Sequence, residues 1–331
     1  MPGEAVVVID VQDCFLPGGS LPTGNARNNA SNPDKRAAAN GLGIAIADFV
    51  NKKNPDHVFV SKDWHPEGHV SFASSHPGYK AFTETWNYGK STNPNAYKGR
   101  KFPAAGEPGE RFWGSAEARQ GQLLWPAHCL QDGDARVAPE FLAKLEQPQL
   151  SKVVNIVKGD DKATDSYSVV ASALGEFTPH VEGDSSAVFR DILIGAELDT
   201  IYLTGIARNV CVFWSAMDIL NYITVPQFVS TGKATKVVFM YNLTRPVAPG
   251  ASDMSPAEVE AAVRELLAKP AMKIADVDAA YKALFEVRGD GSSYNAAGGR
   301  RSSKRKTCRQ RASRSHKHGR NCKKSRRNNR K

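Results

Sequence analysis

Glu4-Ala-Val-Val-Val-Ile-Asp10, close to the amino terminus, is the stretch that decides the fold of this chain of 331 residues. An unbroken run of apolar, mostly β-branched residues is typical of a buried strand in a parallel sheet. The run ends in an acid, Asp10, which places a carboxylate at the carboxyl end of the strand. In open α/β sheets ligands bind at that end of the strands, so Asp10 is a candidate site residue.

Three later strand-like runs also end in residues that carry chemistry. His57-Val-Phe-Val-Ser-Lys-Asp63 ends in a second acid, and Ser151-Lys-Val-Val-Asn-Ile-Val-Lys158 ends in a lysine. Asp199-Thr-Ile-Tyr-Leu-Thr-Gly205 leads through a glycine turn to Cys211 at the start of a predicted helix. If the strands are parallel, all four side chains face one crevice.

Asp63 and His65 stand two residues apart, and a strand sends residues i and i+2 to the same face. A third possible ligand, His128, follows Trp125 and Pro126. Two imidazoles and one carboxylate suit a catalytic divalent metal with open positions. Taken one at a time, these residues could equally be a surface acid and ordinary loop histidines.

Strand and helix patterns alternate along the chain, which predicts an α/β fold with right-handed crossovers and a mostly parallel sheet covered on both faces. A capping serine, Ser255, stands before Pro256 and three residues before Glu258, and predicts a helix start. Strands are expected at residues 4–11, 56–62, 152–157, 200–204 and 235–241, with a weaker one at 272–277. Helices are expected within residues 34–53, 185–193 and 210–220, and after Ser255.

Charge is distributed unevenly. Residues 300–331 contain 16 of the 44 basic residues and no acid, which leaves 28 basic against 34 acidic residues elsewhere. A segment with so few apolar residues cannot bury enough surface to fold alone. We therefore expect a catalytic domain at residues 1–287 and a basic disordered tail at 288–331. Residues 77–122, which have no clear period, are expected to form a partly ordered lid.

Five cysteines without framework spacing argue against a disulfide scaffold and favour a reducing compartment. Cys14 and Cys129 are expected to be structural. With no basic leader and no apolar run of about 18 residues, we expect a cytoplasmic protein with no membrane span. The basic tail leaves nuclear accumulation open, and the sequence does not decide whether the chain forms a homo-oligomer.

The chain resembles the nicotinamidases (pyrazinamidases) of the isochorismatase-like cysteine hydrolase family. The resemblance spans roughly residues 6–277 and departs from the family pattern at Asn209 and Val210. Its motifs are Val8-Ile-Asp10-Val-Gln-Asp-Cys-Phe15, Asp63-Trp-His-Pro-Glu-Gly-His69, Trp125-Pro-Ala-His-Cys129, Val157-Lys-Gly159 with Asp165-Ser-Tyr-Ser168, and Gly205-Ile-Ala-Arg-Asn-Val-Cys211. It implies a three-layer α/β/α fold with a six-stranded sheet in the order 3-2-1-4-5-6.

The resemblance also implies roles. Cys211 is the expected nucleophile, with its pKa lowered by Lys158 and a helix terminus, and Asp10 is the expected base. The N–H groups of Ala207 and Cys211 are expected oxyanion donors, with a cis peptide between Ile206 and Ala207. One divalent metal, expected to be Zn²⁺ with Fe²⁺ or Mn²⁺ as alternatives, would be held by Asp63, His65 and His128. Substrate is expected to contact Phe15, Trp125, Tyr167 and Ile206, while His69 is either a fourth ligand or a residue that orients one.

These expectations define an amidohydrolase that converts nicotinamide to nicotinic acid and ammonia in NAD salvage, through a thioester on the cysteine. One alternative is a related amidase for another small amide. A second is a basic protein on an inactive hydrolase fold that binds nucleic acid without sequence specificity through its arginine-rich tail. That second role would not require Asp10, Lys158 and Cys211 together.

Overall fold

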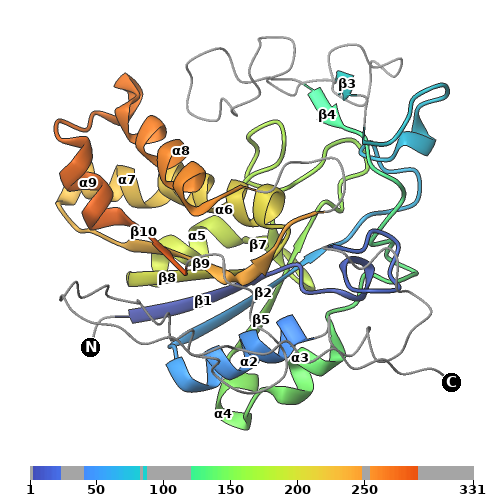
Figure 1. The fold of residues 1–331 in the computed structure, drawn as a ribbon, viewed down its shortest axis with the longest axis horizontal. Helices are drawn as coiled ribbons and strands as arrows, with labels where there is room; N and C mark the ends of the chain where they lie inside the picture. Colours follow the sequence, from blue (N-terminus) through green and yellow to red (C-terminus); the bar gives the residue numbers. More distant parts are fainter. Residues whose placement is uncertain (1–2, 24–40, 83–84, 88–120, 248–253, 290–331) are drawn as a thin grey trace, which may run out of the picture. The chain divides into compact units, whose positions relative to one another are not determined.

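Six parallel strands form the centre of the sheet in the computed structural model, which describes residues 3–23, 41–82, 85–87, 121–247 and 254–289 (Figure 1). Numbered along the chain, the six parallel strands lie in the order 3-2-1-4-5-6, so the predicted topology is confirmed. They are β1 (Gly3–Ile9), β2 (His57–Asp63), β5 (Val153–Lys158), β8 (Leu198–Ile206), β9 (Lys236–Arg245) and β10 (Phe285–Arg288).

Two further strands extend the sheet beyond β5. They are β6 (His180–Val181) and β7 (Asp184–Val188), both antiparallel to their neighbours, and they bring the sheet to eight strands. The helix expected over residues 185–193 is therefore wrong in its first half, because Gly183 makes a left-handed turn and the chain returns as β7. A separate antiparallel pair joins β3 (Thr85–Asn87) to β4 (Gly121–Leu123).

The weak strand expected at residues 272–277 is also wrong. Pro270–Met272 is a short 3-10 helix, Lys273 is left-handed, and Asp276 caps the next helix. The sixth parallel strand is β10 instead, which pairs with β9.

Helices cover both faces of the sheet, with α2 to α4 on one side and α6 to α8 on the other, as expected for three layers (Figure 1). The predicted capping box at Ser255 and Glu258 is confirmed at the start of α8. Short 3-10 helices occupy Asp13–Phe15 and Ala73–Ser75. The longer helices are α2 (Gly41–Lys53), α3 (Pro139–Lys144), α4 (Gln147–Leu150), α5 (Phe189–Gly195), α6 (Phe213–Ile219), α7 (Val225–Thr231), α8 (Pro256–Ala268) and α9 (Val277–Leu284).

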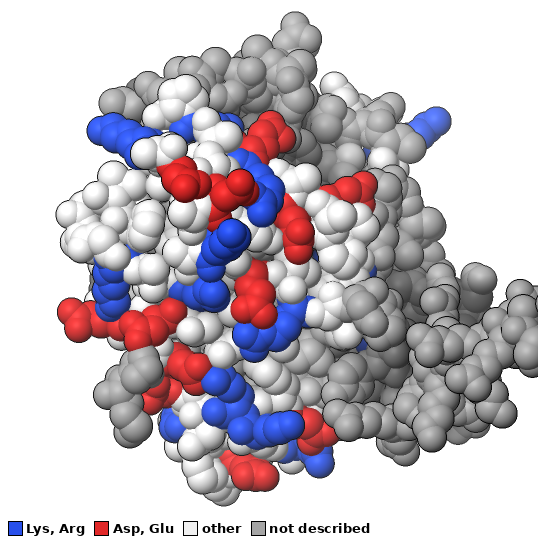
Figure 2. Space-filling model, turned by 60° about the vertical axis from the view of Figure 1, so that its left-hand side comes forward, with Lys and Arg blue, Asp and Glu red and all other residues white. Residues whose placement is uncertain are grey.

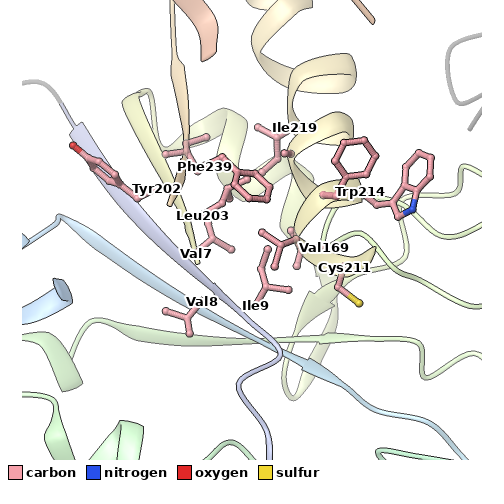
Figure 3. Packing of buried hydrophobic residues seen from close by; sticks show 14 of the residues in the cluster. Val7, Val8, Ile9, Val169, Tyr202, Leu203, Cys211, Trp214, Ile219 and Phe239 are labelled. Atoms are coloured by element: carbon pink, nitrogen blue, oxygen red, sulfur yellow. The ribbon is translucent and has the colours of Figure 1, made fainter. Parts of the chain in front are cut away.

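Strand β1 lies at the centre of the core, between β8 and β2, and its residues from Ala5 to Ile9 are fully buried. Figure 3 shows Ile9 of this strand close to Val169 and Cys211, at the margin of the apolar cluster. Two π-helical segments flank α6, at Arg208–Val212 (η6) and Leu220–Thr224 (η7). The core thus reaches the carboxyl ends of the central strands, where the candidate residues lie.

On the face drawn in Figure 2, the described Lys and Arg side chains alternate with Asp and Glu and form no large patch of one sign. No helix among the described residues is long and apolar enough to cross a membrane. The predicted tail from residue 290 onward and most of the predicted lid lie outside the described residues.

Candidate functional site

Strand register brings the predicted catalytic and metal residues to one end of the sheet. Asp63 and Lys158 are direct partners in the β2–β5 ladder. Ile9, the last residue of β1, is paired with Gly205 of β8. A side chain at Gly205 would place its Cβ 2.0 Å from the Ile9 carbonyl oxygen, so only glycine lets the turn after β8 approach Asp10.

Lys158 is the centre of this arrangement. Its ammonium nitrogen lies 2.9 Å from Asp10 Oδ2 and 2.9 Å from Asp63 Oδ1, and 3.7 Å from the Cys211 sulfur. It also donates to the Ser166 carbonyl oxygen at 3.0 Å. Burial acts to lower the pKa of Lys158, but the charges of Asp10 and Asp63 outweigh it and hold that pKa well above the usual value. The lysine is therefore a permanent cation shared by two carboxylates.

Asp10 is held by a hydroxyl from the neighbouring strand. Ser61 Oγ donates to Asp10 Oδ1 at 2.6 Å and accepts from the Asp10 backbone N–H at 3.1 Å. The Asp10 backbone has a φ of 50°, in the left-handed region that a non-glycine residue rarely adopts. Full burial raises the pKa of Asp10, while Lys158 and Ser61 act to lower it. These contacts occupy Oδ1 and direct Oδ2 towards the ammonium and the sulfur.

Cys211 lies in the π-helical turn that follows β8, and it is the free cysteine of the described residues. Burial raises the pKa of its thiol well above the ordinary value, although Lys158 acts to lower it. The expected lowered pKa is thus wrong, because the sulfur is buried and the carboxylates of Asp10 and Asp63 act against its ionisation. A base close to the sulfur would have to remove the thiol proton before attack.

The three expected metal ligands converge. Asp63 Oδ2 lies 3.0 Å from His65 Nε2 and 3.4 Å from His128 Nε2, and all three side chains are buried. These atoms form a cluster that could hold a metal ion. Each imidazole uses its other nitrogen on a backbone carbonyl, His65 on Gly159 and His128 on Pro126, both at 2.8 Å. Such bonds fix a tautomer in which Nε2 is the ligand atom, so the residues present fit a divalent metal.

His69 belongs with His65 and Asp165 to a second group that could hold a metal ion, but both of its ring nitrogens have other hydrogen-bond partners. Its Nδ1 lies 2.8 Å from Ser71 Oγ and its Nε2 lies 3.3 Å from the Thr164 carbonyl oxygen. The His69 ring stacks on that of His65, with centroids 4.0 Å apart. Burial and the neighbouring His65 hold the pKa of His69 well below its usual range. This geometry favours His69 as a residue that orients His65.

Asp165 and Gln122 are further buried polar groups at the site. Asp165 Oδ1 lies 4.0 Å from His65 Nε2, and its Oδ2 accepts from Gln122 Nε2 at 3.0 Å. Gln122 Nε2 also lies 2.6 Å from the Tyr167 hydroxyl. Gln122 belongs to β4, so the end of the long segment expected as a lid contributes a side chain to the site.

The residues expected to contact the substrate, Phe15, Trp125, Tyr167 and Ile206, are all buried. The Phe15 ring lies 5.6 Å from that of His128, and Trp125 donates its indole N–H to the Tyr167 hydroxyl at 2.9 Å. Ile206 is fully buried at the end of β8. The expected cis peptide between Ile206 and Ala207 is present. The aromatic groups are thus placed near the cluster, as the resemblance implies.

Cys14 and Cys129 form a disulfide, across 115 positions of sequence. Cysteine count alone gave no reason to expect this crosslink, and the preference for a chain without disulfides is wrong for this pair. The bond joins the turn that carries Phe15 to the loop that carries His128. Their predicted structural role is consistent with this position.

Four polar residues of the site carry no expectation from the sequence: Gln12, Ser61, Gln122 and Asp165. Gln12 accepts from the Asp63 N–H at 2.8 Å and donates to the Asp63 carbonyl oxygen at 2.9 Å. Ser61 had a readable signal, since it stands two residues before Asp63 on one strand and so shares its face. Gln12 and Gln122 form hydrogen bonds with residues that are far away in the sequence, so no local sequence pattern predicts their roles.

Three curated relatives are similar to the chain, all named nicotinamidase. The one from Acinetobacter baylyi is 29% identical over 216 residues, which is 65% of this chain and 73% of the relative. Those from Escherichia coli and Saccharomyces cerevisiae are 26% and 22% identical, over 67% and 65% of this chain and 78% and 80% of theirs. No family model matches the chain.

Among solved structures, the yeast nicotinamidase bound to the inhibitor nicotinaldehyde matches with a TM-score of 0.51 and 19% identity, over 82% of this chain and 97% of that one. This match concerns the fold alone, a parallel sheet between helical layers. Sequence relatives and fold together confirm the resemblance, and the chain is a homologue of the nicotinamidases, amide-bond hydrolases of the isochorismatase-like family.

Proposed function

We propose that this chain hydrolyses nicotinamide to nicotinic acid and ammonia through a thioester on Cys211. The observation that carries the proposal is the contact of one buried ammonium, on Lys158, with both the Asp10 carboxylate and the Cys211 sulfur. A base, a cation and a nucleophile within one hydrogen-bonded group are what amide hydrolysis requires. The nicotinamidase relatives support nicotinamide as the amide.

In the first half of the reaction Asp10 Oδ2 takes the thiol proton as the sulfur attacks the amide carbon. The carbonyl oxygen gains negative charge, and the backbone N–H groups of Ala207 and Cys211 are the proposed donors to it. When the C–N bond breaks, Asp10 returns its proton to the leaving nitrogen and ammonia departs. In the second half Asp10 takes a proton from water as the water oxygen attacks the thioester carbon. The C–S bond then breaks, Asp10 passes this proton to the sulfur, and nicotinic acid leaves with the thiol restored.

The raised pKa of the Cys211 thiol fits this sequence of proton transfers. Since the resting cysteine keeps its proton, Asp10 has a proton to accept and later to donate. Burial raises the pKa of Asp10 as well, which makes it a stronger base than an exposed carboxylate. Lys158 stabilises whichever of the two carries the negative charge.

Asp63, His65 and His128 are the proposed ligands of one divalent metal, expected to be Zn²⁺. When bound, the metal would supply a Lewis-acid contact for the pyridine nitrogen and so fix the orientation of the ring. Phe15, Trp125 and Tyr167 are proposed to hold the flat ring, and Ile206 to contact it from the end of β8. His69 and Asp165 orient the ligands.

The test is release of ammonia from nicotinamide and pyrazinamide by the purified full chain, compared with Cys211→Ala and with Cys211→Ser. Both variants should lose at least about 1,000-fold in turnover, since they lack the thiol that forms the thioester. Acid quenching of wild type during turnover should trap one nicotinoyl group on Cys211, seen by mass spectrometry. Turnover by Cys211→Ala within about tenfold of wild type would refute the nucleophile, and hydrolysis of other small amides but not of nicotinamide would refute the substrate.

The basic tail lies outside the described residues. Binding of nucleic acid through it, nuclear accumulation and the domain boundary at residue 287 remain predictions.

A further inference from the structure

Arg208 is a buried cation inside the turn that carries the proposed oxyanion donors. It follows Ala207 directly, opens η6, and is only 7% exposed. Burying a guanidinium is costly unless its N–H groups are satisfied, so its place in this turn requires a physical reason. The catalytic steps above do not use it.

The Arg208 guanidinium is hydrogen-bonded to the end of the neighbouring strand β9. Arg208 Nε donates to Thr244 Oγ1 at 2.9 Å, and one terminal nitrogen donates to the Thr244 carbonyl oxygen at 3.1 Å. Its central carbon lies 3.8 Å from the ring centre of Tyr241. Thr244 Oγ1 in turn donates to the Tyr241 carbonyl oxygen at 2.8 Å. Two donors in a rigid fork and a ring underneath define the position of the arginine closely.

The next residue attaches the turn to the same segment. Asn209 Oδ1 accepts from the Val247 backbone N–H at 3.2 Å. On the other side of the turn, the Ala207 carbonyl oxygen accepts from Val210 and Val212, both at 3.0 Å. Two successive side chains therefore fix the outer side of the turn to the end of β9, while backbone bonds close its inner side.

Thr244 also connects Arg208 to the strand end that carries Asp10. It is the β9 partner of Gly205, the glycine whose backbone lies against Ile9 and hence beside Asp10. A second guanidinium, on the half-buried Arg245, donates to the same Thr244 carbonyl oxygen at 2.7 Å. Arg208 thus connects the turn after β8 to a strand end that is in register with the catalytic base.

We propose that Arg208 is a positioning residue for the oxyanion donors, which holds the segment from Ala207 to Cys211 against β9 through its fork on Thr244. The inference rests on the proposed function, because it needs a reaction in which the carbonyl oxygen becomes charged. A donor displaced by a fraction of an ångström weakens that charged state more than it weakens binding of a neutral ring. Loss of Arg208 should therefore lower kcat and leave KM nearly unchanged.

The experiment compares wild type with Arg208→Met, which keeps an unbranched chain over Tyr241 but removes the fork. Arg208→Lys keeps the charge without the fork, and gives a second readout if the methionine variant does not fold. Arg264→Met is the matched control, because Arg264 also lies over a tyrosine ring, 4.1 Å from the centre of Tyr281, but on the surface helix α8. For each protein, kcat and KM for nicotinamide, bound metal, and affinities for nicotinic acid and pyridine-3-carbaldehyde are measured.

The aldehyde reports on the turn directly. The thiol of Cys211 adds across its C=O bond, forming the S–C bond while the thiol proton moves to the oxygen, and that oxygen occupies the proposed oxyanion position. Arg208→Met should lower kcat by about 10- to 100-fold, weaken the aldehyde by a similar factor, and keep metal, KM and nicotinic acid affinity within about threefold. Arg208→Lys should show a smaller loss of the same kind, and Arg264→Met none.

Arg208→Met with kcat within twofold of wild type would overturn the inference. Equal weakening of aldehyde and nicotinic acid would also overturn it, because that pattern indicates general damage to the pocket. Wild-type protein that releases no ammonia from nicotinamide refutes instead the proposed function, so the two failures are distinguishable.

Discussion

Replacing Lys158 with methionine should destabilise the protein in a way that depends on pH. The side chain is 1% exposed, and its ammonium lies 2.9 Å from both Asp10 and Asp63. Methionine is of similar length and removes the cation together with its hydrogen bond to the Ser166 carbonyl oxygen. Breaking a buried ion pair by removing one partner commonly costs about 3–5 kcal/mol, because the remaining charge is left without compensation.

The sign of the pH dependence follows from Asp10. Burial already raises its pKa, and Lys158 is the main group that opposes this rise. Without the ammonium, the pKa of Asp10 in the folded state moves further above its unfolded value of roughly 4. The folded state then binds more protons than the unfolded state, so stability falls as pH rises between these two pKa values. The deficit of Lys158→Met should be small at pH 5 and reach about 3–5 kcal/mol at pH 8.

Urea unfolding at pH 5, 6.5 and 8 measures this deficit, with chelator in every sample so that metal occupancy is equal. Lys144→Met is the control, because Lys144 pairs with Asp48 on the surface, where ion pairs contribute about 0–1 kcal/mol. Its deficit should be small and flat with pH. A Lys158→Met deficit below about 1 kcal/mol at pH 8, or one equal at pH 5 and pH 8, would contradict the assignment of Lys158 as the shared counter-ion.

Two other predictions concern the metal and the crosslink. His128→Ala should weaken metal binding by at least about 10- to 100-fold, whereas His69→Gln should bind metal far more tightly than His128→Ala, because Ser71 and Thr164 already occupy both His69 nitrogens. Elemental analysis after dialysis measures the bound metal. Equal metal in the two variants would show that the ligand set is wrong. The double variant Cys14→Ser, Cys129→Ser should lose about 5 kcal/mol of unfolding free energy, as expected from the chain entropy of a loop of this length. Wild type in reductant should show the same unfolding free energy as this variant. If urea unfolding shows no loss, the crosslink contributes nothing to stability.

Central strands could be predicted from the sequence because they are buried on both faces and therefore read as unbroken apolar runs. β1 is the clearest case, and the acid that follows it, Asp10, predicted the position of the site. β10 could not be found this way, since Phe285-Glu-Val-Arg288 is short and only partly buried. Its pairing with β9 gives it a strand conformation that four residues alone do not specify.

The site was predictable to the extent that its residues end strands. Asp10, Asp63 and Lys158 meet because parallel strands end at one edge, and register then makes Asp63 and Lys158 neighbours. The direction of the Cys211 pKa shift was not predictable, because it depends on how completely the fold buries the sulfur and on how many carboxylates lie near it. Those are properties of the packed site, and they reversed the expected direction of its pKa shift.

The metal half and the nucleophile half of the site are not independent. Asp63 presents Oδ2 to the two histidines and Oδ1 to Lys158, and Lys158 contacts Asp10 and the sulfur. A divalent cation on Oδ2 would draw negative charge from Asp63, so that less of this charge would compensate the Lys158 ammonium. The ammonium would then interact more strongly with Asp10 and Cys211, and would favour the anionic form of the nucleophile when metal and substrate are in place. The carboxylate proposed to hold the metal would thereby couple metal binding to the reactivity of Cys211.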